Sequence, residues 1–271
     1  MIKFLPLVMG VLLHHYVVAQ PNCNAFLMNG DSCKYKACKY IEDSPNYFQL
    51  TKEFHQVYDK AIEICPAYSQ AYRAKSTAYL KTGDFITWKK LMDKAVSLDA
   101  AQHLSYRGWC RFQFFRDYEG AISDIERLEK LVNYDIGFSQ NGDYHLKVVK
   151  ALCYKMIGEK KKAVKLIEEH ILEDTKNFEL YNYFHLGVLY LEEKQFKEAI
   201  QAFDKQSEVN ELAENQYYKA MAQRALNDLS ASYESLKKAK DFYLNFRFLY
   251  DTYTYQIDKV FLRDIEIALE S

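Results

Sequence analysis

Apolar residues recur along most of the chain with the period of an amphipathic helix, and this pattern itself repeats about every 34 residues. It is clearest in residues 181–203, YNYFHLGVLYLEEKQFKEAIQAF, where two apolar stripes flank a short polar turn at Lys194. Such a unit predicts two antiparallel helices joined by a tight turn. The predicted turns are 33, 42, 36 and 33 residues apart, at Gly83, Arg116, Gly158, Lys194 and Asn227.

Residues at fixed distances from these turns share a type. The position seven residues before the turn is mostly small, which lets one helix approach its neighbour closely. The position four before the turn carries an aromatic ring, except at Gln223. On the second helix, the position five after the turn is mostly alanine or serine. The position nine after it is large and apolar: Met92, Ile125, Ile167, Phe203 and Leu236.

This column pattern resembles that of the tetratricopeptide repeat family over about residues 69–240, with Trp88 and Lys160 as departures. The resemblance implies an all-α solenoid of antiparallel helix hairpins and no cofactor. In that family the first helices line a concave surface that commonly holds an extended peptide. The positions that face this surface carry Arg73, Tyr106, Phe184 and Tyr217, which are therefore the predicted peptide-binding residues.

Composition and length agree with a helical repeat array. The chain has only 9 glycines and 4 prolines in 271 residues, and no run of alternating strand-like residues. We predict a cysteine-rich segment with a degenerate helix hairpin at 20–66 and five repeats at 67–240. The remaining segment, 241–271, contains an amphipathic stretch from Ile257 to Leu269. It is expected to form a capping helix, because an open stack needs its last apolar face covered.

The first residues, MIKFLPLVMGVLLHHYVVAQ, have the features of a secretory signal peptide over residues 1–19. Lys3 precedes an apolar run from Phe4 to Leu13, and cleavage is expected after Ala19. The apolar run is short for a bilayer span of about 20 helical residues, so no integral membrane span is expected in the mature chain. The predicted location is the periplasm or the cell exterior.

Cysteine usage also indicates an oxidising compartment, because four of the six cysteines lie in the first quarter of the chain. The length of the helix before Cys65 disfavours a bridge from it to Cys38. Two pairing schemes remain, with Cys65 joined to Cys33 or to Cys23, and we favour Cys23 with Cys38 and Cys33 with Cys65. Four buried thiols are the alternative. Cys110 and Cys153, on neighbouring first helices, are expected to be free.

Charge and motifs exclude several classes of function. Basic and acidic residues number 36 and 37, so no positive field favours nucleic acid as a partner. The histidines of the mature chain lack the paired spacing of a zinc helix, and no metal site is predicted. Phosphate-binding glycine loops and nucleophile elbows are also absent from the sequence.

The 42-residue spacing indicates an insertion, which a repeat stack tolerates as a loop on one face. We place it at 131–143, LVNYDIGFSQNGD. Its aromatic and amide side chains suit a binding edge, with Tyr134, Phe138, Gln140 and Asn141 as the predicted contacts. Alternatively, Tyr134 and Phe138 fold back as a plug while Asn141 and Gly142 form a tight turn.

Two functions follow from these patterns. The first is a non-catalytic scaffold that holds a protein or peptide partner through the concave surface and the loop, and we favour it. The second is a hydrolase or sugar-active enzyme built around residues 131–145, with Asp135, Asp143 and His145 as candidates. Two carboxyl groups about 5–10 Å apart in a closed pocket would favour the enzyme.

Overall fold

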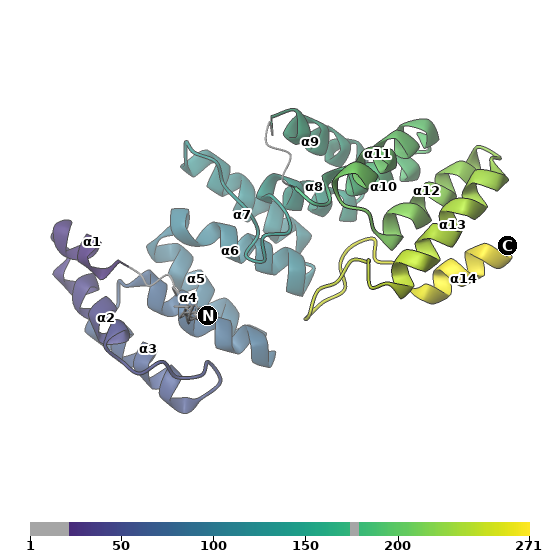
Figure 1. Cartoon of the computed structure of the whole chain (residues 1–271). Helices are drawn as coiled ribbons and strands as arrows, with labels where there is room; N and C mark the ends of the chain where they lie inside the picture. The colour runs from purple at the N-terminus through teal and green to yellow at the C-terminus, as the bar shows by residue number, and fades with distance from the viewer. Residues whose placement is uncertain (1–21, 174–178) are drawn as a thin grey trace, which may run out of the picture. The chain divides into compact units, whose positions relative to one another are not determined.

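The computed structural model describes residues 22–173 and 179–271. The chain divides into two compact units, 1–94 and 95–271. The predicted signal peptide, residues 1–19, lies outside the described residues. The described chain is helical, with one isolated β-bridge between Phe138 and His145. The prediction of an all-α fold built from helix pairs is therefore confirmed (Figure 1). The boundaries predicted at 66 and 240 stay predictions.

The first unit begins with three short helices that two disulfides hold together. They are α1 (Cys23–Met28), α2 (Ser32–Glu42) and α3 (Lys52–Ile64), followed by α4 (Ser69–Thr82) and α5 (Phe85–Leu98), whose last turn extends past Lys94. The disulfides join Cys23 to Cys38 and Cys33 to Cys65, which is the pairing favoured from the sequence. Helix α1 was not predicted.

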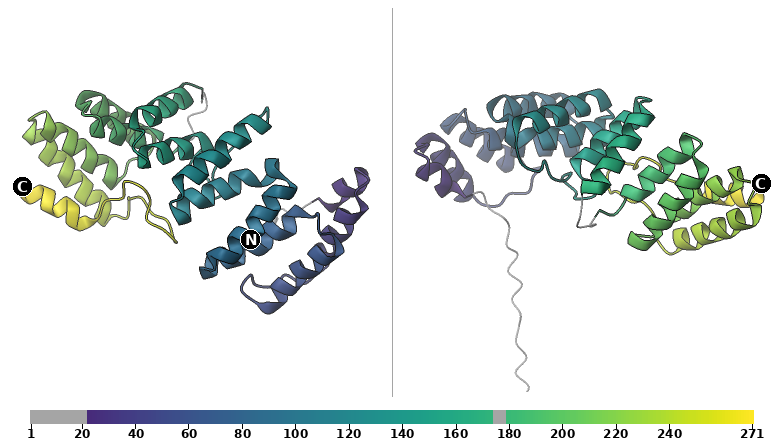
Figure 2. Two further views of the ribbon diagram at one scale, coloured as in Figure 1. Left: turned by 180° about the vertical axis from the view of Figure 1, so that it is seen from behind. Right: turned by 90° about the horizontal axis from the view of Figure 1, so that it is seen from above.

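In the second unit the helices pair in sequence order (Figure 2). The first helices are α6 (Ala100–Cys110) with the π-helix η1 (Arg111–Phe115), α8 (Leu146–Met156), α10 (Asn182–Glu192) and α12 (Ala213–Ala225). Their partners are α7 (Tyr118–Leu131), α9 (Lys160–Glu173), α11 (Phe196–Val209) and α13 (Leu229–Leu244). Cys110 and Cys153 are buried thiols in first helices, outside the two disulfides, as predicted.

All five predicted turn residues adopt the left-handed conformation, with φ between 54° and 89°. This conformation ends a helix by letting the next amide donate back to a carbonyl of the last turn. In four hairpins that carbonyl lies five residues earlier, as in Asp84 N to Tyr79 O. In the second hairpin Asp117 N reaches Arg111 O, six residues back, because η1 adds one residue to the last turn.

The predicted columns form the contacts between the paired helices. The five large residues nine positions after each turn are all fully buried. Gly187 shows why the facing column is small: a Cβ at this position would lie 2.5 Å from the ring of Phe203. The side chain of Phe203 therefore fixes how closely α10 and α11 approach each other.

The predicted C-terminal capping helix is present, but it begins later than the apolar pattern from Ile257 indicated. Helix α14 covers only Leu262–Glu270, and packs on α13 with Ile265 fully buried. The preceding residues 245–261, which we call the return segment, are non-helical. Phe246 and Asp258 have φ of 59° and 65°, and a right-handed helix cannot continue through such residues. They lie between the end of α13 and the start of α14. Within the second unit, the return segment reaches from α13 back toward α6 (Figure 1 and the left panel of Figure 2).

Candidate functional site

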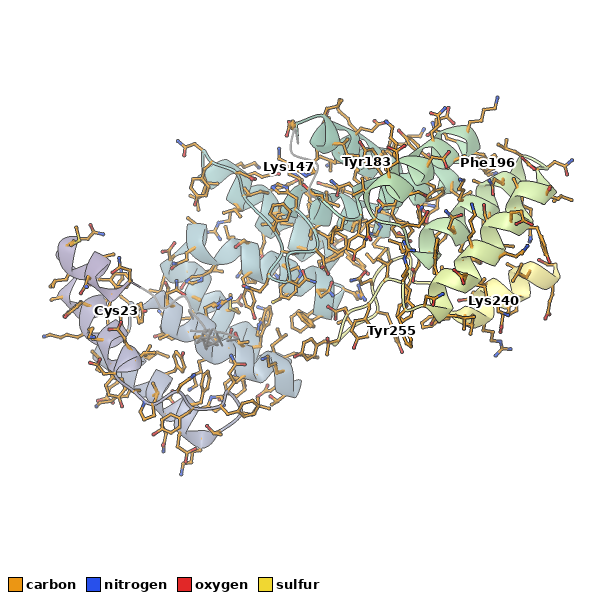
Figure 3. All side chains as sticks on the ribbon, in the orientation of Figure 1. Cys23, Lys147, Tyr183, Phe196, Lys240 and Tyr255 are labelled. Atoms are coloured by element: carbon orange, nitrogen blue, oxygen red, sulfur yellow. A yellow bond between two sulfur atoms is a disulfide. The ribbon has the colours of Figure 1, made fainter. Side chains whose placement is uncertain are left out.

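The return segment lies across the first helices of the second unit and is held there by polar contacts. Thr254 Oγ1 accepts a hydrogen bond from Gln113 Nε2 in η1, at 2.8 Å. The neighbouring Tyr255 carbonyl accepts one from Arg116, which ends that helix. In Figure 3 Tyr255 lies on the return segment, away from α12 and α13. At the next residue, Gln256 Oε1 accepts a hydrogen bond from the Tyr144 hydroxyl, at 3.3 Å.

An ion cluster joins the return segment to α8 and α10. Asp258 Oδ1 lies 2.6 Å from Lys155 Nζ, and Asp258 Oδ2 lies 3.2 Å from His185 Nδ1. Lys155 also pairs with Glu192, at 3.1 Å. The side chains of Asp258, Lys155 and His185 are 9%, 5% and 0% exposed, so this cluster is shielded from water. Such shielding makes the loss of one charge costly.

The electrostatics of the cluster favour an ionised Asp258 beside a neutral His185. Burial acts to raise the pKa of Asp258, but the hydrogen bond from His185 and the Lys155 charge lower it on balance. Burial lowers the pKa of His185, against the opposing effect of Asp258. The carboxylate is therefore the group that the cationic side chain of Lys155 holds in place.

Side chains of the return segment alternate between the helices and solvent. Tyr253 and Tyr255 are 67% and 71% exposed, whereas Thr254 between them is half-buried and Gln256 is 7% exposed. The alternation is confined to residues 253–256, because the backbone bends at 252–254 and turns at 257–258. The first helices thus bind a non-helical stretch of polypeptide from the same chain.

The predicted concave-surface residues are not gathered at this contact. Phe184 is fully buried and packs in the core with Phe203, and Tyr106 is 7% exposed beside Trp109. Tyr217 packs against the core cluster that α14 covers, and Arg73 lies in α4 of the first unit. Their roles in binding stay predictions. The contacts of the return segment instead use polar first-helix residues, which an apolar stripe does not reveal.

The inserted loop forms a turn that ends on the first residues of α8. Ser139 N donates to Tyr144 O, Gly142 N donates to Ser139 O, and Gly142 has a positive φ. Phe138 packs edge-on against the His145 ring but is still 48% exposed, and Tyr134 is 63% exposed. Gln140 and Asn141 are also exposed. The loop thus combines features of the two alternatives, a tight turn and exposed aromatic rings.

A pair of stacked histidines lies beneath this loop. The rings of His145 and His170 are 4.4 Å apart and nearly parallel. His145 Nε2 lies 2.7 Å from Asp135 Oδ1, and His170 Nε2 lies 2.5 Å from Glu179 Oε1. His145 Nδ1 accepts the Lys147 amide, at 3.2 Å, and so caps the start of α8. Since Nδ1 is an acceptor, the proton of the neutral ring lies on Nε2 and is donated to Asp135.

Acidification is expected to destabilise the folded chain through His145. Burial lowers the pKa of His145 and outweighs the opposing hydrogen bond to Asp135, and the neighbouring His170 adds a smaller lowering effect. Because the folded pKa lies below the unfolded value of about 6.5, the unfolded chain binds more protons as the pH falls below that value. The free energy of unfolding should then fall by up to about 1.4 kcal/mol per pH unit for this residue, until the pH passes its folded pKa.

Urea unfolding between pH 8 and 5 measures this effect, with His145→Asn as the comparison. Asparagine keeps an N-cap acceptor but does not titrate. We expect a shallower pH dependence in His145→Asn, with a remaining slope from His55 and His185, whose pKa values burial also lowers. Equal slopes for the two proteins would contradict the assignment.

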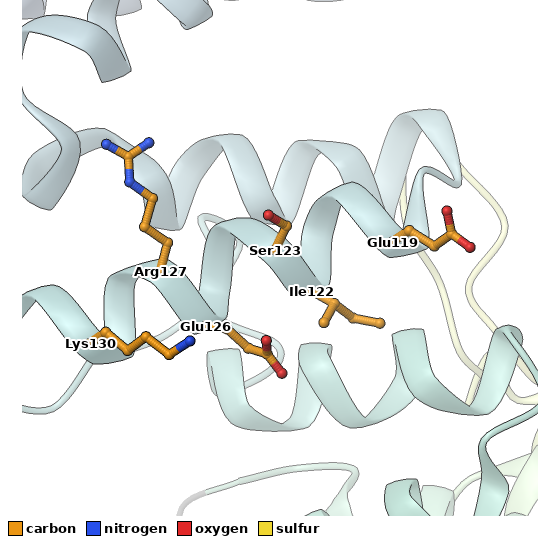
Figure 4. A pocket seen from close by; sticks show the side chains of 6 residues that line it. All are labelled: Glu119, Ile122, Ser123, Glu126, Arg127 and Lys130. Atoms are coloured by element: carbon orange, nitrogen blue, oxygen red, sulfur yellow. The ribbon is translucent and has the colours of Figure 1, made fainter.

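Asp135 and Asp143, the carboxyl groups of the enzyme alternative, have different partners: Asp135 pairs with His145 and Asp143 with Asn141. Asp143 accepts a hydrogen bond from Asn141 Nδ2, at 2.6 Å, and burial raises its pKa. Among the described residues, no three His, Cys, Asp or Glu side chains are grouped to hold a metal ion. A depression of about 400 Å³ lies elsewhere, on α7, and none of the predicted site residues line it (Figure 4). Its walls are Glu119, Ile122, Ser123, Glu126, Arg127 and Lys130.

The family model described as "Tetratricopeptide repeat" matches residues 69–102 and 180–211. Both segments therefore carry the tetratricopeptide repeat pattern, as predicted. The predicted helical solenoid is confirmed, and the other three repeats stay predictions. No curated protein sequence matches the chain significantly.

Solved structures similar to this chain include PilW, a widely conserved type IV pilus biogenesis factor, at 12% identity and a TM-score of 0.59. That alignment covers 90% of this chain and 94% of PilW. PilF of Pseudomonas aeruginosa is similar at 13% identity and a TM-score of 0.57, over 90% and 93% of the two chains. YrrB, a TPR protein with an unusual peptide-binding site, gives 19% and 0.54, over 69% and 93%. At these identities the similarity shows the fold alone.

In the described part of the chain, no helix is both long enough and apolar enough to cross a bilayer.

Proposed function

We propose that this protein is a non-catalytic scaffold that binds an extended segment of a protein or peptide partner along the first helices of its second unit. The observation that carries the proposal is the return segment, which those helices already hold through contacts to its backbone and side chains. A surface that orders a non-helical stretch of its own chain has the donors and charges to order a segment of another chain. The description of YrrB as a protein with a peptide-binding site adds support at the level of the fold.

We further propose that the scaffold acts outside the cytoplasm, in the periplasm or the cell exterior. The two disulfides of the first unit support this location, because such bridges persist in oxidising compartments. The signal-peptide pattern of residues 1–19 supports it independently.

Selection of random 12-residue peptides on the disulfide-bonded chain tests the binding function. We expect enriched peptides to slow hydrogen exchange in α8 and α10, and Lys155→Met to weaken their binding at least about 10-fold, because a buried charge contact is lost. Lys165→Met is the matched control, since its side chain is 74% exposed on α9. Failure to enrich any peptide, or protection confined to other helices, would contradict the proposal.

A further inference from the structure

We propose that residues 250–258 of the return segment are a built-in competitor for the peptide site, and that this site selects extended segments with a carboxylate at the place of Asp258. The inference rests on the proposed function and adds the chemistry of the partner and the way in which its access is limited.

The return segment is fixed at both ends, so its central part can leave without unfolding the helices that flank it. Leu249 and Val260 are 1% and 3% exposed and belong to core clusters. The amides of both residues donate to the carboxylate of Glu214, at 3.0 and 3.5 Å, and Lys259 pairs with the same carboxylate. Ala213 N donates to the Arg247 carbonyl, at 2.8 Å. These contacts hold the ends to α12.

The central part is held by few contacts and buries little apolar surface. Its aromatic rings, Tyr250, Tyr253 and Tyr255, are 67–71% exposed. Its anchors are the contacts of Thr254, Tyr255 O and Gln256 and the ion cluster of Asp258. A neutral hydrogen bond contributes only about 0.5–1.5 kcal/mol net, so the contacts of residues 254–256 add little to the attachment. The shielded ion cluster of Asp258 is then the main anchor, and the central part leaves when another carboxylate replaces that of Asp258.

The charge of the site selects what can take the vacated place. The groups in contact with Asp258 are Lys155 and His185. Glu192 lies 3.1 Å from Lys155 and also pairs with Lys160, at 3.0 Å. Without Asp258, two lysines face one glutamate beside a neutral histidine. The site then carries a net positive charge, and a carboxylate on an incoming segment restores the balance.

Tethering makes the return segment an effective competitor. A segment joined to its own site is present there at an effective concentration in about the millimolar range. If it occupies the site for more than about 90% of the time, the apparent affinity for a peptide added in solution falls at least about 10-fold. A variant that weakens only the anchor of the return segment should therefore regain this lost affinity for the added peptide.

A labelled peptide with the sequence of residues 250–261, YDTYTYQIDKVF, tests the proposal by fluorescence anisotropy with the full disulfide-bonded chain. Asp258→Asn removes the charge of the anchor and keeps a residue that tolerates a positive φ. We expect the peptide to bind Asp258→Asn at least about 10-fold more tightly than wild type. The matched control is Asp204→Asn on α11, outside the return segment, whose carboxylate is 53% exposed and pairs with Lys219, and it should bind as wild type does.

A second peptide with asparagine at the Asp258 position tests the carboxylate requirement, and we expect it to lose most of the binding to Asp258→Asn. If Asp258→Asn does not fold, the double variant Thr254→Ala/Gln256→Ala weakens the other anchors and should also raise peptide binding. The proposal is overturned if the native peptide binds all folded variants alike, if it binds none of them, or if the two peptides bind equally. Library-selected peptides that bind wild type and Asp258→Asn with one affinity would leave the proposed function intact and reject the competitor alone.

Discussion

Replacing both Cys33 and Cys65 with alanine is expected to lower the free energy of unfolding of the first unit by about 2–4 kcal/mol. The bridge joins the first turn of α2 to the residue that follows α3, across a sequence separation of 32 residues. Its loss frees a long loop in the unfolded chain. Hydrogen exchange of the α2 and α3 amides measures the effect separately from the unfolding of the second unit.

The Cys23–Cys38 bridge provides the matched comparison, because it spans a separation of only 15 residues. On loop length alone, its removal should cost about 0.7 kcal/mol less than removal of the longer bridge. Alkylation of the unfolded, unreduced protein should modify two cysteines, Cys110 and Cys153. Four or six modified thiols would show that one or both bridges do not form, and would remove a main support for a location outside the cytoplasm.

The repeat architecture was predictable because its causes are local in sequence. Each turn needs one residue in the left-handed conformation, and each pair of helices needs a small residue opposite a large one. Gly83 and Gly158 suit the first requirement, and Gly187 opposite Phe203 meets the second. These requirements recur at nearly constant spacing, so the five turns could be located from the sequence.

The contacts of the return segment could not be predicted in this way. Asp258 is 103 residues from Lys155 and 73 from His185, and Thr254 is 141 residues from Gln113. No periodic pattern links positions so far apart. The apolar residues of 257–269 indicated a helix, yet Val260 is buried at the end of a non-helical stretch rather than on a helical stripe. The stacking of His145 on His170 likewise depends on how α8 packs against α9.

Removing the carboxylate of Asp124 should have the other large effect on stability, in the second unit. Asp124 of α7 is 3% exposed and receives two hydrogen bonds from Arg107 of α6, at 2.8 and 2.6 Å. Arg111, the first residue of η1, pairs with the same carboxylate at 3.0 Å. Asp124→Ala leaves two largely buried guanidinium groups without this partner. The expected loss is about 3 kcal/mol in urea unfolding, because an uncompensated buried charge is costly.

The double variant Arg107→Met/Asp124→Leu is the control, since it replaces both partners with apolar groups and should recover most of the loss. A loss below about 1 kcal/mol in Asp124→Ala would show that the cluster is solvated and unimportant for stability. Hydrogen exchange distinguishes a loss of stability in the second unit from a change at the proposed peptide site. Gln113 and Arg116 lie on the turn that Arg111 begins, so Asp124→Ala should speed hydrogen exchange both in α7 and at Thr254 and Tyr255. Asp258→Asn should speed exchange at Thr254 and Tyr255 while α7 stays protected, because its carboxylate contacts only α8 and α10.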